Sequence, residues 1–146
     1  MTELTDDELA FLAGMFDLAR EGRTAELRAA IDAGVPANLT NESGDTLLVL
    51  AAYHDHPATV QALLAAGADP ERVNDRGQTA LAAATFRRSG AGVSALLAAG
   101  ADPRTGPRSA LDVARFFGLD DMLALLEPAD AGPRGVAGAD PTPAGS

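Results

Sequence analysis

The stretch Leu63-Leu64-Ala65-Ala66-Gly67-Ala68-Asp69-Pro70 returns unchanged as Leu96-Leu97-Ala98-Ala99-Gly100-Ala101-Asp102-Pro103. The residues between the two copies keep the same offset, because Gly44-x-Thr46 matches Gly77-x-Thr79. A fixed period of roughly 33 residues is typical of a stacked solenoid, in which each unit buries its apolar face against the next. The chain is therefore predicted to be a repeat protein, with its function on the stacked surface rather than in a pocket.

The residues that carry the period, Gly-x-Thr-x-Leu-x-x-Ala and Leu-Leu-x-x-Gly-Ala-Asp, resemble the ankyrin repeat. The resemblance covers about 120 of the 146 residues and implies a hairpin loop followed by two antiparallel helices in each unit. It predicts an all-α ankyrin-repeat solenoid of about four helix-turn-helix repeats with short hairpin-like loops. The predicted parts are an N-terminal capping repeat (1–40), two full repeats (41–73 and 74–105), a shortened C-terminal capping repeat (106–127) and a disordered Pro/Gly/Ala-rich tail (128–146).

The first and last units depart from the pattern in different ways. Gly34 precedes Gly67 by the same offset that separates Gly67 from Gly100, so residues 6–40 form a degenerate first repeat. Ser109 follows Thr79 sooner than Thr79 follows Thr46, which predicts a loop three residues shorter in the last repeat. In every repeat this chain lacks both the Pro and the His of the family's Thr-Pro-Leu-His sequence. The polar contacts that the His makes between neighbouring repeats in the family are therefore expected to be absent here.

Local signals place the helices. Thr5-Asp6-Asp7-Glu8 has the spacing of a capping box, so a helix is expected to start near residue 6 and to stop at Gly22. An apolar stripe on this helix is expected to cover the open end of the stack, and its polar outer face is assigned to Glu3, Asp6, Asp7, Glu8 and Asp17. The middle helices are predicted at 47–54, 57–65, 80–87 and 91–99, and Pro128 is expected to end the last helix, so that the fold ends near Glu127.

Composition excludes several classes of partner. The formal net charge of −10 disfavours nucleic acid and anionic membranes, which bind through clustered Lys and Arg. The chain has no cysteine, no apolar run long enough for a membrane span, and no basic leader at its start. We therefore expect a cytoplasmic protein that is monomeric when free and that binds neither nucleic acid nor membrane.

A catalytic site is not expected. In His54-Asp55-His56, the only histidine cluster, the two rings point to different faces, and His56 is interpreted as a structural residue. No serine has the context of a nucleophile, and no phosphate-binding loop is present. We predict no enzymatic activity, no cofactor, no metal and no small-molecule substrate.

The end of each inner helix offers a candidate binding surface. Tyr53, Phe86 and Phe116 occupy the same position in three repeats of a chain with only six aromatic residues. Aromatic and Arg side chains dominate binding hot spots, so this ladder is predicted to anchor a partner. The alternative is that the rings pack between repeats and complete the core, and Phe117 is assigned to the core. The neighbouring Arg20, His54 and Arg87 are predicted to contact the partner as well.

The hairpin tips form a second candidate surface, whose charge changes from acidic to basic along the stack. Its predicted partner-binding residues are Asp45, Arg76, Gln78 and Arg108. Such a gradient would orient an extended partner, although ordinary solvated loops have similar charges. The sequence thus favours a non-catalytic adaptor or scaffold that binds another protein on its concave face. The alternative is an inhibitory subunit that occludes a partner enzyme's basic site.

Overall fold

The computed structural model describes residues 5–131, and within that range the chain is helical. The helices are α1 (Asp6–Glu21), α2 (Thr24–Asp32), α3 (Leu47–Tyr53), α4 (Pro57–Ala65), α5 (Ala80–Phe86), α6 (Gly90–Ala98), α7 (Ala110–Phe116) and α8 (Asp120–Ala131). Each predicted middle helix is present, with ends that differ from the prediction by one residue at most. No helix in the described part is long and apolar enough to cross a membrane.

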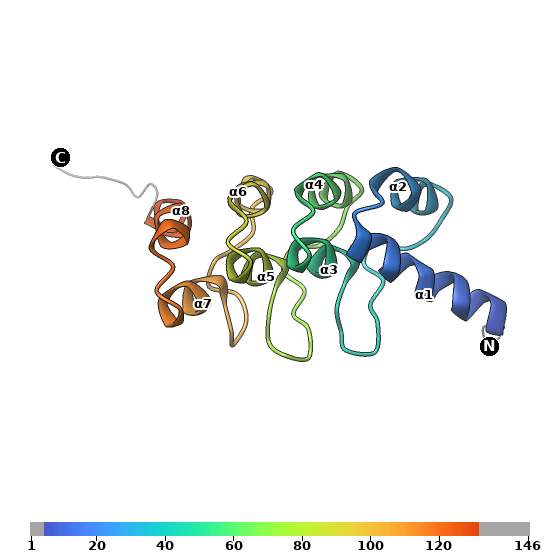
Figure 1. Cartoon of the computed structure of the whole chain (residues 1–146), viewed down its shortest axis with the longest axis horizontal. Helices are drawn as coiled ribbons and strands as arrows, with labels where there is room; N and C mark the ends of the chain where they lie inside the picture. Colours follow the sequence, from blue (N-terminus) through green and yellow to red (C-terminus); the bar gives the residue numbers. More distant parts are fainter. Residues whose placement is uncertain (1–4, 132–146) are drawn as a thin grey trace, which may run out of the picture.

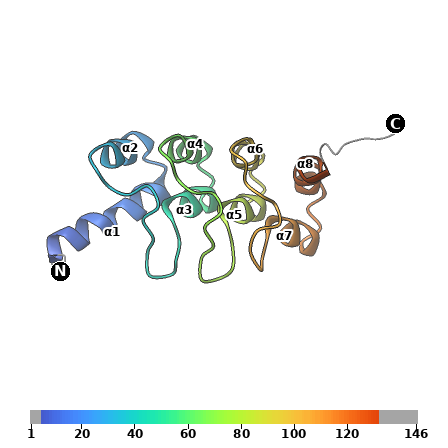
Figure 2. The same cartoon turned by 180° about the vertical axis from the view of Figure 1, so that it is seen from behind.

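The helices form two parallel rows (Figure 1). An inner row contains α1, α3, α5 and α7, and an outer row contains α2, α4, α6 and α8, each packed against its neighbours in the same row and against its partner in the same repeat. The connecting segments 33–46, 66–79 and 99–109 project together from the inner row, away from the outer helices (Figure 2). Segment 99–109 is three residues shorter than segment 66–79, as the change of offset predicted.

Small residues let the helices approach closely at the centre of each repeat. Ala51, Ala84 and Ala114 are completely buried, and leucines such as Leu48 and Leu81 fill the space between repeats. Burying one leucine side chain contributes about 1.5 to 3 kcal/mol. One continuous core therefore runs from Met15 in α1 to Leu126 in α8.

Side-chain caps start the inner helices. Thr5 and Glu8 form the predicted capping box, and Gly22 ends α1 in a left-handed conformation. The side chains of Thr46, Thr79 and Ser109 accept hydrogen bonds from backbone amides three residues on, at 3.0, 3.1 and 3.2 Å. These caps satisfy free amide donors at the helix starts, where the family's Pro and His are missing.

The turn between the two helices of each repeat confirms the repeat frame. Gly22, Asp55, Arg88 and Gly118 all have left-handed backbone, with φ between 56 and 70°. The first three recur at the full repeat offset, and Gly118 follows Arg88 at the shorter offset of the last unit. The degenerate first unit and the shortened last unit are thus structural repeats of the same kind.

The predicted end of the fold is wrong by four residues. Helix α8 continues through Pro128 to Ala131 instead of ending near Glu127. Proline fixes φ at about −65°, a value compatible with helical backbone, although it removes one hydrogen bond and disfavours a helix beyond the first turn. The rest of the predicted disordered tail, residues 132–146, lies outside the described residues.

Candidate protein-interaction surface

Four aromatic rings form a continuous row across three repeats. The ring of Tyr53 stacks on that of Phe86, with centroids 6.0 Å apart and planes 5° from parallel. Phe86 meets Phe117 edge-on at 5.6 Å, and Phe117 meets Phe116 edge-on at 4.9 Å. We call Tyr53, Phe86, Phe117 and Phe116 the aromatic row. Its members come from the last residues of α3 and α5 and from the end of α7.

The aromatic row is exposed to solvent. Relative exposure is 36% for Tyr53, 40% for Phe86 and 82% for Phe116, so these rings do not complete the core. The assignment of Phe117 to the core is wrong, because Phe117 is 53% exposed and joins the row. Phe117 is the C-cap of α7, one residue past the regular helix, so the helical period does not dictate which way its side chain points.

The far end of the row borders a cavity of about 500 Å³ between α5 and α7. Four residues predicted to bind a partner, Gln78, Phe86, Arg108 and Phe116, line it together with Pro107, Asp112, Val113 and Phe117. The fold therefore joins the two surfaces that the sequence suggested separately, the inner helix ends and the hairpin tips. Apolar walls with a few charged groups at the edge are typical of sites that accept a partner's side chain.

Cationic and imidazole groups surround the near end of the row. The guanidinium carbon of Arg87 lies 5.8 Å from the centre of the Tyr53 ring, and the His54 ring meets that ring edge-on at 5.3 Å. Partial burial lowers the pKa of His54, and repulsion from the neighbouring His56, Arg20 and Arg87 lowers it further. The His54 side chain is therefore mainly neutral at pH 7 and places an uncharged polar ring beside Tyr53.

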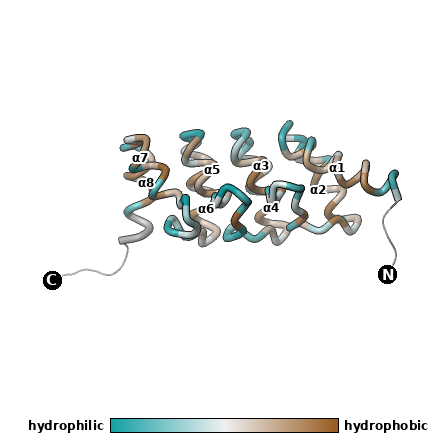
Figure 3. Tube along the Cα trace, turned by 90° about the horizontal axis from the view of Figure 1, so that it is seen from below, coloured by the Kyte–Doolittle hydropathy of each residue, from teal (hydrophilic) through white to brown (hydrophobic). Residues whose placement is uncertain are grey.

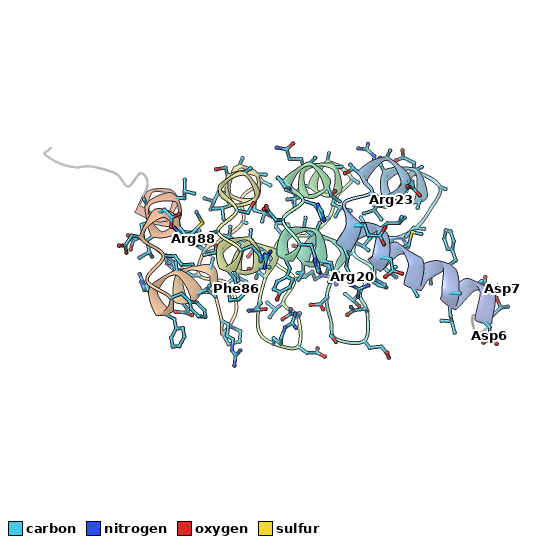
Figure 4. All side chains as sticks on the ribbon, viewed as in Figure 1. Asp6, Asp7, Arg20, Arg23, Phe86 and Arg88 are labelled. Atoms are coloured by element: carbon cyan, nitrogen blue, oxygen red, sulfur yellow. The ribbon has the colours of Figure 1, made fainter. Side chains whose placement is uncertain are left out.

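Arg20 lies at the end of α1 next to α3, as Figure 4 shows. Its guanidinium pairs with Asp17 at 2.9 Å, and its carbonyl oxygen accepts a hydrogen bond from His56 Nε2 at 2.7 Å. The His56 ring thus connects the first two repeats, which confirms its structural interpretation. Among the described residues no group of three potential ligands is placed to hold a metal.

Asp45 does not lie at an exposed hairpin tip. It is only 5% exposed, and its carboxylate accepts hydrogen bonds from Asn74 Nδ2 at 2.8 Å and from Arg76 at 3.4 Å. The partner for this carboxylate comes from the next repeat, 29 residues away in the chain, which a local sequence pattern does not reveal. Asp45 holds two hairpins together, while the Arg76 side chain stays mostly exposed beside it.

Comparison with known proteins fits this geometry. The family model for ankyrin repeats in three copies matches residues 15–106, which is more than half of the chain. The chain belongs to the ankyrin-repeat family. An ankyrin repeat protein of Pseudomonas aeruginosa is 44% identical over 59 residues, a match that covers 40% of this chain and 34% of that protein. The ankyrin repeat domain of human ASB11 superposes with a TM-score of 0.72 at 28% identity, covering 81% of this chain and 54% of that domain.

Membership of the ankyrin-repeat family indicates the general class of function. The chain matches about a third of the bacterial relative and about half of the human domain, so the comparison covers only part of each. Ankyrin repeats in general are protein–protein interaction modules, and the family is typically non-catalytic. Fold alone does not select the face that binds, and that choice depends on the residues of the surface.

Proposed function

We propose that this ankyrin-repeat protein binds a segment of another protein where its inner helices meet the hairpins, with the aromatic row as anchor. The observation that carries the proposal is that four exposed rings contact one another across three repeats. A contiguous exposed apolar patch is uncommon on a soluble protein and marks an interaction surface. Large aromatic groups also bury much area at small entropy cost, which suits them as anchors.

Polar residues around the row would select the partner. Gln78 and Arg108 line the cavity, and Arg87 lies against Tyr53. Within residues 5–131 neither Arg87 nor Arg108 forms an ion pair with a carboxylate, so their charges are available to a ligand. Arg20, His54 and Arg76 complete this set, whereas the carboxylate of Asp45 is already used inside the protein.

The partner's response separates the two roles that such binding allows. An adaptor bridges two proteins and leaves their activities unchanged, whereas an inhibitory subunit lowers the activity of one partner in a one-to-one complex. We propose the adaptor role, since anchors spread along several repeats suit an extended segment. A partner enzyme that loses activity on stoichiometric addition of this chain would reverse that assignment.

The test compares two variants, each of which replaces exposed apolar side chains with smaller ones. The variant Tyr53→Ala/Phe86→Ala/Phe116→Ala/Phe117→Ala removes the aromatic row, and Leu9→Ser/Phe11→Ser changes exposed apolar residues at the other end of the stack. Each protein is used to capture partners from extract of the source organism, and affinities are then measured with the purified partner. We expect the first variant to weaken binding of at least one partner more than tenfold, at unchanged helicity, and the second to leave that partner bound. Equal binding by wild type and the first variant would refute the aromatic row as the site.

A further inference from the structure

The chain continues beyond α8 from a place close to the aromatic row. Helix α8 packs against α7, whose last residue is Phe116, and Figure 3 shows the two helices together at the end of the stack with apolar residues on both. Phe117 follows directly, and α8 begins three positions later at Asp120. We call residues 132–146, which follow the last residue of α8, the tail.

The tail is long enough to reach the row. The 12 residues of α8 rise about 18 Å, and the connection from Phe117 to Asp120 adds at most about 11 Å. The end of α8 therefore lies within about 29 Å of Phe117, whatever the direction of the helix. Extended residues 132–141 span up to about 33 Å. The second half of the tail can therefore lie on the rings at the end of the row.

The sequence of the tail favours polyproline II conformation. The tail contains Pro133, Pro141 and Pro143, and the last two flank Thr142 in its second half. Proline fixes φ close to the value of polyproline II, which has three residues per turn and no internal hydrogen bonds. Such a segment loses little further entropy when it docks, and grooves lined by aromatic rings are a recurrent docking surface for it.

The spacing of these two prolines matches the spacing of the rings. Polyproline II rises about 3.1 Å per residue, so Pro141 and Pro143 are about 6 Å apart along the helix axis. Neighbouring ring centroids in the aromatic row are 6.0 and 5.6 Å apart from Tyr53 to Phe117. With three residues per turn, the two prolines occupy two edges of the helix and Thr142 occupies the third. Both prolines can therefore contact one surface while Thr142 faces away from it.

The charges of the tail match those of the cavity beside the row. The cavity lining has one cation, Arg108, and one carboxylate, Asp112. The tail likewise has one carboxylate, Asp140, and one cation, Arg134. Asp140 shares an edge of the polyproline II helix with Pro143, so it faces the same surface as the prolines. The tail thus brings a counter-charge for each charged group of the lining, which favours its register there.

The covalent link favours the tail over a second copy of the chain as occupant. A short flexible linker gives a tethered segment a local concentration in the millimolar range. A contact with a Kd of about 1 mM would then cover the row in about half of the molecules. A second copy would have to bind much more tightly to do the same at micromolar concentration. Covering the row also shields a contiguous apolar patch from solvent.

We propose that the tail folds back over the aromatic row, with Pro141 and Pro143 on the rings and Asp140 beside Arg108. The inference rests on the proposed function, because the row is the surface proposed to bind a partner. A partner then binds by displacing the tail. The tail is a built-in competitor, so that only segments with a higher affinity for the rings occupy the site.

Disulfide cross-linking tests the proposal in the full chain, which has no cysteine of its own. Gln78→Cys lies in the cavity lining, and Ala144→Cys directly follows the two prolines. The reduced double variant is placed in a glutathione redox buffer, and the intramolecular disulfide is followed over time by mass spectrometry. The matched pair Gln61→Cys/Ala144→Cys has its first cysteine at an exposed position of α4 in the outer row. We expect the first pair to cross-link at least about threefold faster.

Three further changes, each added to Gln78→Cys/Ala144→Cys, test the register. Pro141→Ser/Pro143→Ser keeps the length and charge of the tail and should slow cross-linking about threefold. Phe116→Ala/Phe117→Ala removes two rings of the row and should slow it to the same extent. Thr142→Ala changes the edge that faces away and is expected to cross-link as its parent does. Circular dichroism checks that all variants are folded.

Two results would overturn the proposal directly. One is an equal rate of cross-linking with and without Pro141→Ser/Pro143→Ser, and the other is an equal loss of rate in Thr142→Ala. Disulfides that form between molecules instead of within one would assign the row to the tail of a second copy.

The measurement contains no partner, so the two proposals fail separately. A row without a tail over it can still bind a partner, and a covered row can lack one. Where both proposals hold, Pro141→Ser/Pro143→Ser raises the affinity for a partner about twofold, because a competitor that occupies about half of the sites is removed. Unchanged affinity in that variant, measured with a partner that needs the row, would contradict the competition.

Discussion

The second hairpin, residues 73–79, and the third, residues 103–109, position their inner helices by different means. The second is held internally, because Asn74 Oδ1 accepts hydrogen bonds from the amides of Arg76 and Gln78, both at 3.0 Å. Asn74 Nδ2 also donates to Asp45 of the first hairpin at 2.8 Å. One buried side chain thus fixes the turn and ties it to the preceding repeat.

The third hairpin depends on its neighbour. It has no asparagine, and at the shorter offset of the last unit Arg104 stands at the position of Asn74. The Arg108 amide donates to the carbonyl oxygen of Gly77 at 3.0 Å, and the Pro107 ring packs so closely on Gly77 that a Cβ there would lie 2.6 Å from Pro107 Cγ. The second hairpin makes the equivalent bond to its own neighbour, from the Asp75 amide to the Ser43 carbonyl oxygen at 3.0 Å. What the third hairpin lacks is the set of internal bonds that Asn74 makes in the second, and in this sense its order is borrowed from its neighbour. The third hairpin borders the proposed partner site, through Pro107 and Arg108.

Replacing Asn74 with Ala tests the internally held hairpin and has the largest expected effect. Three hydrogen bonds are lost at about 1 kcal/mol each, so the free energy of unfolding should fall by about 3 kcal/mol. Urea denaturation followed by circular dichroism measures it. Asn41→Ala is the matched control: Asn41 accepts only two such bonds, from the Ser43 and Asp45 amides, and it lies closer to solvent. Because Asn41 makes two bonds and is only partly buried, its replacement should cost no more than about 2 kcal/mol. Equal losses in the two variants would show that the bond to Asp45 adds nothing.

The fold follows from the sequence because its signals are local and repeated. Gly34, Gly67 and Gly100 recur in phase, and each has the positive φ that favours glycine. The hydroxyl at each inner helix start is likewise visible in the sequence. The cap of Thr5 was predicted, and Thr46, Thr79 and Ser109 cap their helices in the same way in the structure. Helix positions can therefore be predicted almost to the residue.

The candidate surface is less predictable, since it depends on contacts between repeats. The ladder of Tyr53, Phe86 and Phe116 follows from the period, but the burial of Asp45 depends on Asn74 from the next repeat. The match of Asn41 with Asn74 at the repeat offset is present in the sequence and is the signal that could have revealed this network. Phe117 lies beyond the helical period, so only the packed structure shows that it joins Phe86 and Phe116.

Gly77→Ala tests the borrowed order of the third hairpin. Gly77 has φ of +80°, so a Cβ there costs about 1 to 2 kcal/mol and also displaces Pro107. We expect a loss of about 2 kcal/mol in unfolding free energy and faster hydrogen exchange of the Arg108 amide. The control Gly44→Ala is at the equivalent position with φ of +75°. Its Cβ would lie 2.8 Å from Asp75 Oδ1, which is exposed and can move, and 3.2 Å from the Asp75 backbone nitrogen, a milder contact than the one with the Pro107 ring. It should cost about 1 kcal/mol, and a larger loss than that of Gly77→Ala would contradict the dependence on Pro107.

Glu71→Ala tests the same dependence with the smallest expected effect on stability. The Glu71 carboxylate accepts hydrogen bonds from the Asp102 amide at 3.0 Å and from Thr105 Oγ1 at 2.5 Å, and so holds the third hairpin to the second repeat pair. Because the group is partly exposed, the unfolding free energy should fall by no more than about 1 kcal/mol. Asn38→Ala removes the equivalent bond one repeat earlier, where Asn38 Oδ1 accepts from the Asp69 amide at 2.7 Å. If the third hairpin depends on its neighbour for its order, Glu71→Ala should accelerate hydrogen exchange at the Arg108 and Leu111 amides. Asn38→Ala should leave the Gln78 amide protected, because that amide donates to Asn74. Equal acceleration in both hairpins would mean that Asn74 does not make the second one independent.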